Sequence, residues 1–122
     1  MKESTSQLAY ALYANSAANQ PVGSVFTTSA FNASGPPALG TSTWTHLAMT
    51  WDGGTVRLYV DGALVATQAS TGSLLTGTGA LRIGGNSIRN EFFSGVIDEV
   101  RVYDRALSAA RITADMAAPV GS

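Results

Sequence analysis

The sequence lacks several features that define large functional classes. It has no cysteine, which excludes disulfides and thiolate metal sites, and a single histidine, which excludes a zinc site with several histidines. Only 12% of residues are charged, the formal net charge is −1, and no basic cluster occurs, so nucleic acid is not an expected partner. No apolar run approaches the length of a membrane span, so we expect no membrane insertion.

The length and composition that remain describe an all-β module. A chain of 122 residues fits one domain with its own core. Glycine, serine, threonine and alanine take the place of charged residues, which is typical of extracellular and cell-surface domains. We therefore expect a single domain over residues 1–122, with loose ends at 1–6 and 117–122. Residues 1–6 do not have the pattern of a secretory signal.

The clearest pattern lies in residues 44–65, which predict three consecutive antiparallel strands. Apolar residues alternate over 47–51 and over 56–60, as in strands with one buried face. Asp52-Gly53-Gly54 separates the first two strands, and Asp61-Gly62 separates the second from the third. Asp-Gly is a strong signal for a two-residue hairpin, because both turn positions need a positive φ.

The rest of the chain predicts further short strands and one helix. We expect strands at 7–14, 22–28, 81–83 and 92–103, of which the last is the longest, and loops at 29–42, 69–79 and 86–91. The helix is expected from Ala109 to Met116, because the Ser108 hydroxyl can accept a hydrogen bond from a free amide of the first turn. Many short strands at regular spacing predict an antiparallel β-sandwich.

Several of these segments also resemble a known family. Residues 44–48, Trp51-Asp52-Gly53 and residues 56–62 resemble the laminin G-like jelly-roll domain of the concanavalin A-like lectin/glucanase superfamily. Residues 81–85 and 93–108 are similar to that family's closing segment. The resemblance covers about residues 7–116 and implies a jelly-roll β-sandwich with one short C-terminal helix.

Family members usually carry several strands ahead of the strand that contains Leu8 and Tyr10, and these strands are missing here. The resemblance therefore implies an N-terminally truncated sandwich with open strand edges and uncovered apolar surface. We expect such a surface to be completed by a second copy of the chain or by a complementing protein segment. The alternative is a shortened sandwich that closes alone.

Few residues suggest catalysis. The sequence has no Gly-x-Ser-x-Gly nucleophile motif and no His-Glu-x-x-His motif. Glycoside hydrolysis commonly needs paired carboxylates, whereas Asp98 and Glu99 are adjacent and point to opposite faces of a regular strand. Glu99 shares its face with Arg101, so we expect a solvated ion pair, and His46 is expected to be structural. We expect a protein that is not an enzyme, with glycoside processing as the weaker alternative.

Asp98 is the one residue that breaks its local pattern. It has the parity of Val96, Val100 and Val102, so it is expected on the buried face of the predicted strand. Burying a carboxylate there is costly unless it accepts hydrogen bonds from loop amides, pairs with an arginine or binds a metal ion. Because many relatives hold calcium, the resemblance implies Asp98 as a candidate calcium ligand, while bonds within the protein are the favoured reading.

The best local candidate for ligand contact is the polar loop that contains Asn86, Arg89 and Asn90, beside Phe92. Sugar-binding sites use planar amides, charged groups and an aromatic platform, and an ordinary connecting loop is the alternative reading. Trp44 has the opposite parity to the core residue Trp51, so an exposed Trp44 could stack on a sugar ring.

Together these features predict a recognition or adhesion module of a larger secreted or cell-surface bacterial protein, with a glycan as the expected ligand. The second hypothesis is an assembly module whose main partner is another protein chain or a copy of itself.

Overall fold

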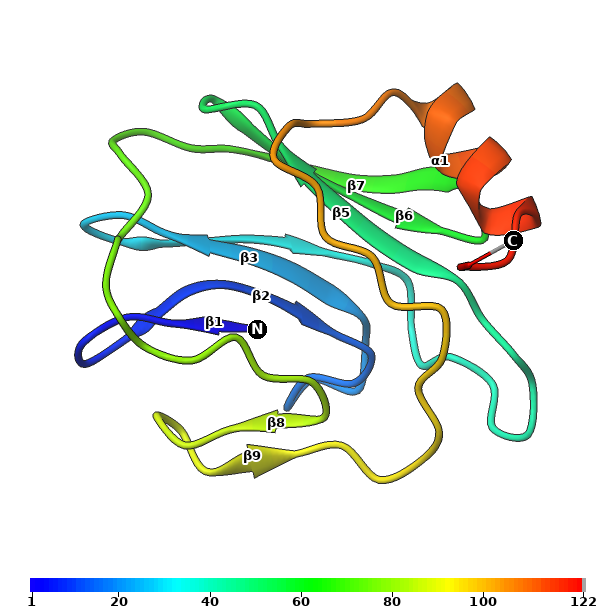
Figure 1. The fold of residues 1–122 in the computed structure, drawn as a ribbon, viewed down its shortest axis with the longest axis horizontal. Coiled ribbons are helices and arrows are strands. Elements are labelled where there is room, and N and C mark those ends of the chain that lie inside the picture. The colour runs from blue at the N-terminus through cyan, green and yellow to red at the C-terminus, as the bar shows by residue number, and fades with distance from the viewer. Residues whose placement is uncertain (122) are drawn as a thin grey trace.

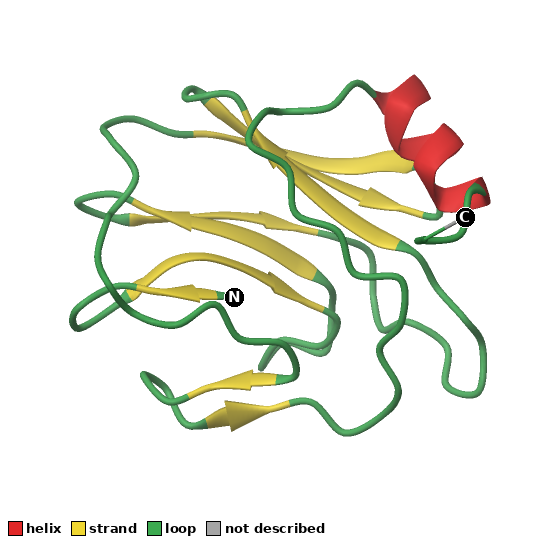
Figure 2. Cartoon of the chain, viewed as in Figure 1, coloured by secondary structure: helices red, strands yellow, loops and turns green. Residues whose placement is uncertain are grey.

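Two antiparallel β-sheets stack face to face in the computed structural model, which describes residues 1–121 (Figure 1). The first sheet has the order β1 (Lys2–Glu3), β2 (Leu8–Tyr13), β3 (Val22–Phe26) and β4 (Ala30–Ser34). The second has the order β5 (Leu47–Trp51), β6 (Thr55–Val60) and β7 (Ala63–Ala69). A separate hairpin joins β8 (Gly85–Asn86) to β9 (Glu91–Phe92), and helix α1 spans Ala109–Ala117. The expected all-β sandwich with one C-terminal helix is confirmed (Figure 2).

The main core lies between the two sheets. Val25 and Ala33 from the first sheet and Val56 and Leu58 from the second form one cluster of buried side chains. Trp51 packs against this cluster, and its indole Nε1 donates a hydrogen bond to the Ser70 hydroxyl at 2.9 Å. The alternation predicted the burial of Val56 and Leu58 correctly, but a register shift after Leu58 buries Tyr59 and leaves Val60 only partly buried.

Both turns of the second sheet have the predicted chemistry. Asp61 and Gly62 have φ values of 49° and 81°, as a two-residue hairpin with two positive φ angles requires. A Cβ added to Gly62 would lie 2.9 Å from the Thr113 hydroxyl of α1, so this turn also lets the helix approach. In the other turn, a carboxylate oxygen of Asp52 accepts hydrogen bonds from the amides of Gly54 and Thr55, at 2.9 and 2.8 Å.

Helix α1 begins where the sequence predicted. The Ser108 hydroxyl accepts a hydrogen bond from the Arg111 amide at 3.2 Å, and Ile112 is buried. In the part of the chain that the structure describes, no helix has the length and apolarity needed to cross a bilayer.

Two strands lie where loops or loose ends were expected, so these expectations are wrong. β1 falls within residues 1–6, where Lys2 pairs with Tyr10 of β2 and Glu3 is buried. β4 falls within the predicted loop at 29–42, and all five of its residues pair with β3. Neither segment alternates clearly in sequence. The strand conformation of both depends on pairing with residues elsewhere in the chain, which leaves no local signal.

The predicted long strand at 92–103 is also wrong. β9 ends at Phe92, and residues 93–107 run as an irregular chain between the hairpin and α1 (Figure 1). A strand needs a neighbouring strand to bond with, and the described residues offer none to this segment. In place of the predicted strand at 81–83, the structure has one isolated bridge between Leu81 and Lys2. The predicted loop at 86–91 contains the turn of the β8–β9 hairpin and one residue of each of its strands.

Candidate ligand-binding site

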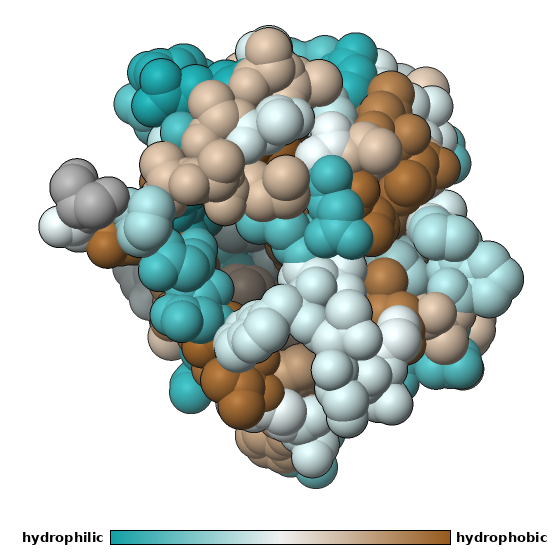
Figure 3. All heavy atoms as spheres, turned by 90° about the vertical axis from the view of Figure 1, so that its right-hand side faces the viewer, coloured by the Kyte–Doolittle hydropathy of each residue, from teal (hydrophilic) through white to brown (hydrophobic). Residues whose placement is uncertain are grey.

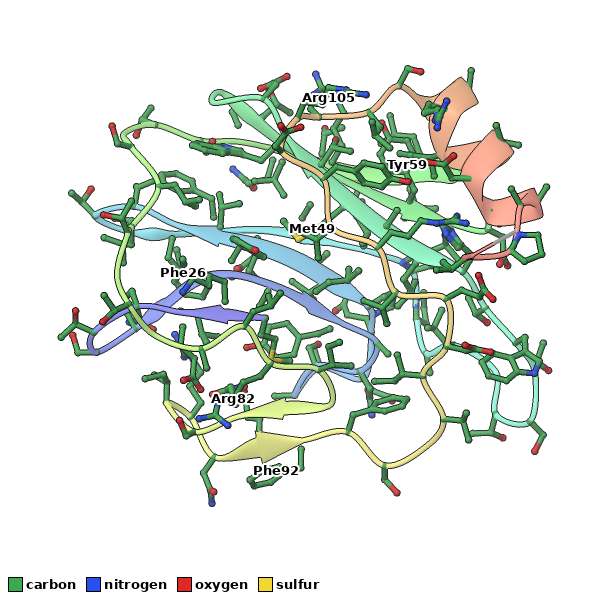
Figure 4. The ribbon with its side chains drawn as sticks, in the orientation of Figure 1. Phe26, Met49, Tyr59, Arg82, Phe92 and Arg105 are labelled. Carbon is green, nitrogen blue, oxygen red and sulfur yellow. The ribbon has the colours of Figure 1, made fainter. Side chains whose placement is uncertain are left out.

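The β8–β9 hairpin borders an open groove of about 610 Å³. Arg82, Ser87, Asn90 and Phe92 line the groove with side chains of four different chemical types. The Phe92 side chain lies on the outer side of the hairpin, away from the body of the protein, with Arg82 on the segment that leads into β8 (Figure 4). Phe92 is 75% exposed, so most of its ring is open to solvent.

A buried carboxylate fastens this hairpin to the first sheet. One oxygen of Glu3 accepts hydrogen bonds from the Ser87 amide at 2.7 Å, the Ser87 hydroxyl at 2.9 Å and the Arg82 Nε at 2.9 Å. The Ser87 amide, with the other two donors, holds the pKa of Glu3 below its ordinary value. The amino group of Met1 also donates to the Arg82 carbonyl at 2.9 Å. One edge of the groove is therefore fixed by residues from the start of the chain.

A second carboxylate fastens the other strand of the hairpin. Glu91 accepts hydrogen bonds from the Tyr13 hydroxyl and from the Asn86 side-chain amide, both at 3.0 Å. Burial raises the pKa of Tyr13 to about 12, and the hydrogen bond to Glu91 adds to this effect. Both strands of the hairpin are thus anchored to the first sheet by side chains.

The structure places Asn86, Arg89 and Asn90 on this one hairpin, but it uses them differently. Asn86 is 1% exposed, and its side-chain oxygen accepts from the Arg89 amide at 2.7 Å, so it shapes the turn. Arg89 donates to the Gln7 side chain at 2.7 Å and lies 5.4 Å from the ring of Phe26. Asn90 is exposed and lines the groove at a φ of 54°.

Sequence reasoning missed Arg82 as a groove residue, whereas Ser87 belongs to the polar loop that the sequence indicated. Arg82 was expected inside a short strand, and its bond to Glu3, which also binds Ser87, holds it beside the hairpin. Phe92 was noted as a neighbour of the loop, and its large exposure makes it the most prominent group of the groove. Trp44 is 70% exposed, but it lies on the loop before β5 and does not line this groove.

The expected burial of Asp98 is wrong. Residues 91–100 are all exposed, because they pack under no second layer of the described chain. A carboxylate oxygen of Asp98 accepts from the adjacent Glu99 amide at 2.8 Å. Within residues 1–121, no group of three or more histidine, aspartate and glutamate residues is placed to hold a metal ion. Calcium binding at Asp98 stays a prediction.

The expected ion pair between Glu99 and Arg101 is also wrong. Arg101 donates to the carbonyls of Asp115 and Ala118 at the end of α1, and Glu99 accepts from the Val120 amide. Together with Asp115, these two side chains line a second hollow of about 200 Å³.

His46 lines the same hollow. Its amide donates to Asp61 at 2.9 Å, and its buried Nδ1 has no hydrogen-bond partner among the described residues. The histidine therefore lies against the C-terminal end of α1 as well as at the start of β5.

Comparisons with known proteins agree with the fold. The family described as "Concanavalin A-like lectin/glucanases superfamily" matches residues 2–113. Pappalysin-1 of Mus musculus is 35% identical over 78 residues, which are 60% of this chain and 5% of that protein. The crystal structure of an S-layer domain-containing protein from Clostridium thermocellum matches with a TM-score of 0.57 and 25% identity. That match covers 80% of this chain and 57% of the crystallised chain.

Proposed function

Because the chain belongs to the concanavalin A-like lectin/glucanases superfamily, we propose that it is a non-catalytic recognition module of a larger secreted or cell-surface bacterial protein, with a carbohydrate as its ligand. Both relatives described above are longer than the part that this chain matches, which supports a role as one module among several. The printed name of the structural relative, an S-layer domain-containing protein, supports a place at the cell surface.

The observation that carries the proposal is the exposed ring of Phe92 beside polar groups in one groove. A sugar presents an apolar ring face and a rim of hydroxyl groups. The Phe92 ring would stack against the face, while the Asn90 amide, the Ser87 hydroxyl and the Arg82 guanidinium offer hydrogen bonds to the rim. A few polar groups around an apolar contact are the usual composition of a small-ligand site.

The anchoring of the hairpin supports binding rather than catalysis. Glu3 and Glu91, the carboxylates beside the groove, are both engaged in hydrogen bonds within the protein. No carboxylate belongs to the described lining of the groove. Since glycoside hydrolysis commonly needs a free pair of carboxyl groups, the arrangement favours recognition of an intact glycan.

Titration followed by NMR tests this proposal. Cello-, xylo-, laminari- and chito-oligosaccharides would be added separately to the labelled protein while backbone amide signals are recorded. We expect saturable shifts for amides of residues 82–92 with one of these sugars, and we expect Phe92→Ala to abolish them, because the stacking surface is gone.

Trp44→Ala is the matched control, since Trp44 is an equally exposed aromatic residue outside the groove. It should leave the shifts unchanged. Shifts that are centred on Trp44 and lost in Trp44→Ala would show that the sugar binds at Trp44 and not in the groove. The absence of a response to all four sugars would contradict the proposal that the ligand is a carbohydrate.

A further inference from the structure

Residues 93–103 expose their apolar side chains to solvent, and this is the least expected feature of the structure. We call the six exposed residues Phe93, Val96, Ile97, Val100, Val102 and Tyr103 the apolar row. Their exposed fractions lie between 41% and 73%. Hydrophobic side chains also reach the surface on the face that carries α1 and the C-terminal end (Figure 3).

The polarity of this segment is inverted. Glu99, Arg101 and Tyr103 bond to the end of α1 and to the residues after it, so the polar groups point toward the protein. Val100 and Val102, which alternate with them, are 44% and 59% exposed. When an amphipathic segment exposes its apolar side chains to solvent, those side chains mark an interaction surface for another chain.

The backbone of this segment is equally uncovered. From Ser94 to Leu107 the described structure contains no hydrogen bond between backbone groups. The sequence here is rich in β-branched residues, which favour strands. Glu99 has a φ of 55°, a region that L-residues with long side chains rarely adopt, and an extended strand would relieve it. Both observations indicate a strand that lacks its neighbour.

We propose that residues 94–103 pair with the same residues of a second copy of this chain, as antiparallel strands related by a two-fold axis. The extent of the apolar row fits a strand-pairing partner. Its six apolar side chains are roughly half exposed and present on the order of 500 Å². That equals the largest apolar patch of a typical monomer, about 300–600 Å², and patches of this size mark interaction sites. Pairing of the two backbones would bury further area, toward the about 800 Å² that each partner of a stable interface buries.

The charges of the segment also suit self-pairing. With the two-fold axis at Val100, Glu99 lies opposite Arg101 of the second copy, and Ile97 lies opposite Tyr103. In this register Asp98 lies opposite Val102, so no two like charges oppose each other. A two-fold axis closes the assembly at two chains, because each copy offers the same surface to the other.

Sedimentation across a wide range of protein concentrations tests this proposal. We expect a closed dimer, and we expect Val100→Lys to raise its dissociation constant by at least about tenfold, because the charge would enter the centre of the apolar contact. The matched control is Leu64→Lys on the exposed edge strand β7, where the native side chain is 51% exposed. This control should leave the dimer intact.

A monomer at every concentration would overturn the proposal, and so would open-ended oligomers or a dimer that only Leu64→Lys dissociates. Hydrogen exchange supplies a second readout. Amides of residues 96–102 should be protected in the dimer and exchange rapidly in Val100→Lys, and rapid exchange in an intact dimer would refute strand pairing. The outcome is independent of the proposed function, because Phe92→Ala tests glycan binding and Val100→Lys should keep it.

Discussion

Two stretches of this chain have nearly the same sequence and opposite surroundings. Val56-Arg57-Leu58-Tyr59 forms the middle of β6, while Val100-Arg101-Val102-Tyr103 lies in the irregular segment before α1. In the first stretch, Val56 and Leu58 are completely buried and Tyr59 is 4% exposed. In the second, the corresponding valines and tyrosine are between 41% and 59% exposed.

The difference lies in the neighbours. β6 has β5 on one side, β7 on the other and the first sheet against its inner face. Residues 100–103 have none of these among the described residues, and their polar side chains bond to the end of α1 instead. Local sequence can therefore favour a strand strongly, but only pairing and a covered face produce one.

The largest effect should come from removing matched apolar side chains in the two stretches. Leu58→Ala should lower the free energy of unfolding by about 2–5 kcal/mol, because it leaves a cavity between the sheets. Val102→Ala should change it by less than about 0.5 kcal/mol in the monomer, since Val102 is 59% exposed. Urea unfolding at low protein concentration measures both. Equal losses would mean that the second stretch is buried in solution.

A smaller effect should follow from the carboxylate that anchors the hairpin. The pKa of Glu3 is lowered from 4.5 in the folded protein, chiefly by the Ser87 amide. A carboxyl group whose pKa is lowered by folding stabilises the fold fully at pH values above its pKa in the unfolded protein. This contribution is lost as the pH falls through its pKa in the folded protein. We therefore expect the melting temperature to decline below about pH 4.5.

Glu3→Gln keeps the shape of this side chain and removes its charge. It should lower the melting temperature at neutral pH and make the decline in acid shallower, because one titrating carboxyl group is gone. Thermal melts at a series of pH values compare the variant with the natural protein. An identical acid limb in both would show that Glu3 does not contribute to the acid sensitivity.

The smallest expected effect on the melting temperature comes from substituting two exposed aspartates, Asp52 and Asp98. The Arg57 guanidinium and the Gly54 and Thr55 amides lower the pKa of Asp52 from 3.8 to about 2, so its stabilisation is present above pH 3.8 and lost toward pH 2. Among the described residues, Asp98 accepts only from the Glu99 amide. Asp52→Asn should lower the melting temperature slightly, and Asp98→Asn should not change it. If calcium raises the melting temperature of the natural protein and not that of Asp98→Asn, the predicted calcium site gains its first support.

The sequence was informative where the signals are local. The turn at Asp61 and Gly62, the burial of Val56 and Leu58 in β6 and the Ser108 cap each involve residues close in the chain, and all three are confirmed. β4 was missed because its pairing with β3, rather than its own pattern, makes it a strand. β1 was missed for the same reason, since it pairs with β2 and Leu81.

The candidate groove could be predicted only in part. Asn90 and the neighbouring Phe92 were recognisable from the sequence as a polar loop beside an aromatic residue. The inward roles of Asn86 and Arg89 could not be, because they depend on Glu91 and Gln7, which only the fold brings close. The alternation of residues 96–102 predicted a buried Asp98, which is wrong because the argument assumed a regular strand that the described residues do not form.

The bonds between Glu3 and the hairpin also have a consequence for the order of folding. They join residues 79 and 84 positions apart, so the chain must close a long loop before β1 is complete. During synthesis, β1 leaves the ribosome before residues 82–87 and must wait for them, while β5, β6 and β7 can pair as soon as their short turns emerge. β1 is thus made well before the hairpin that holds it and is among the last of these strands to be finished, and topologies with such distant contacts fold slowly.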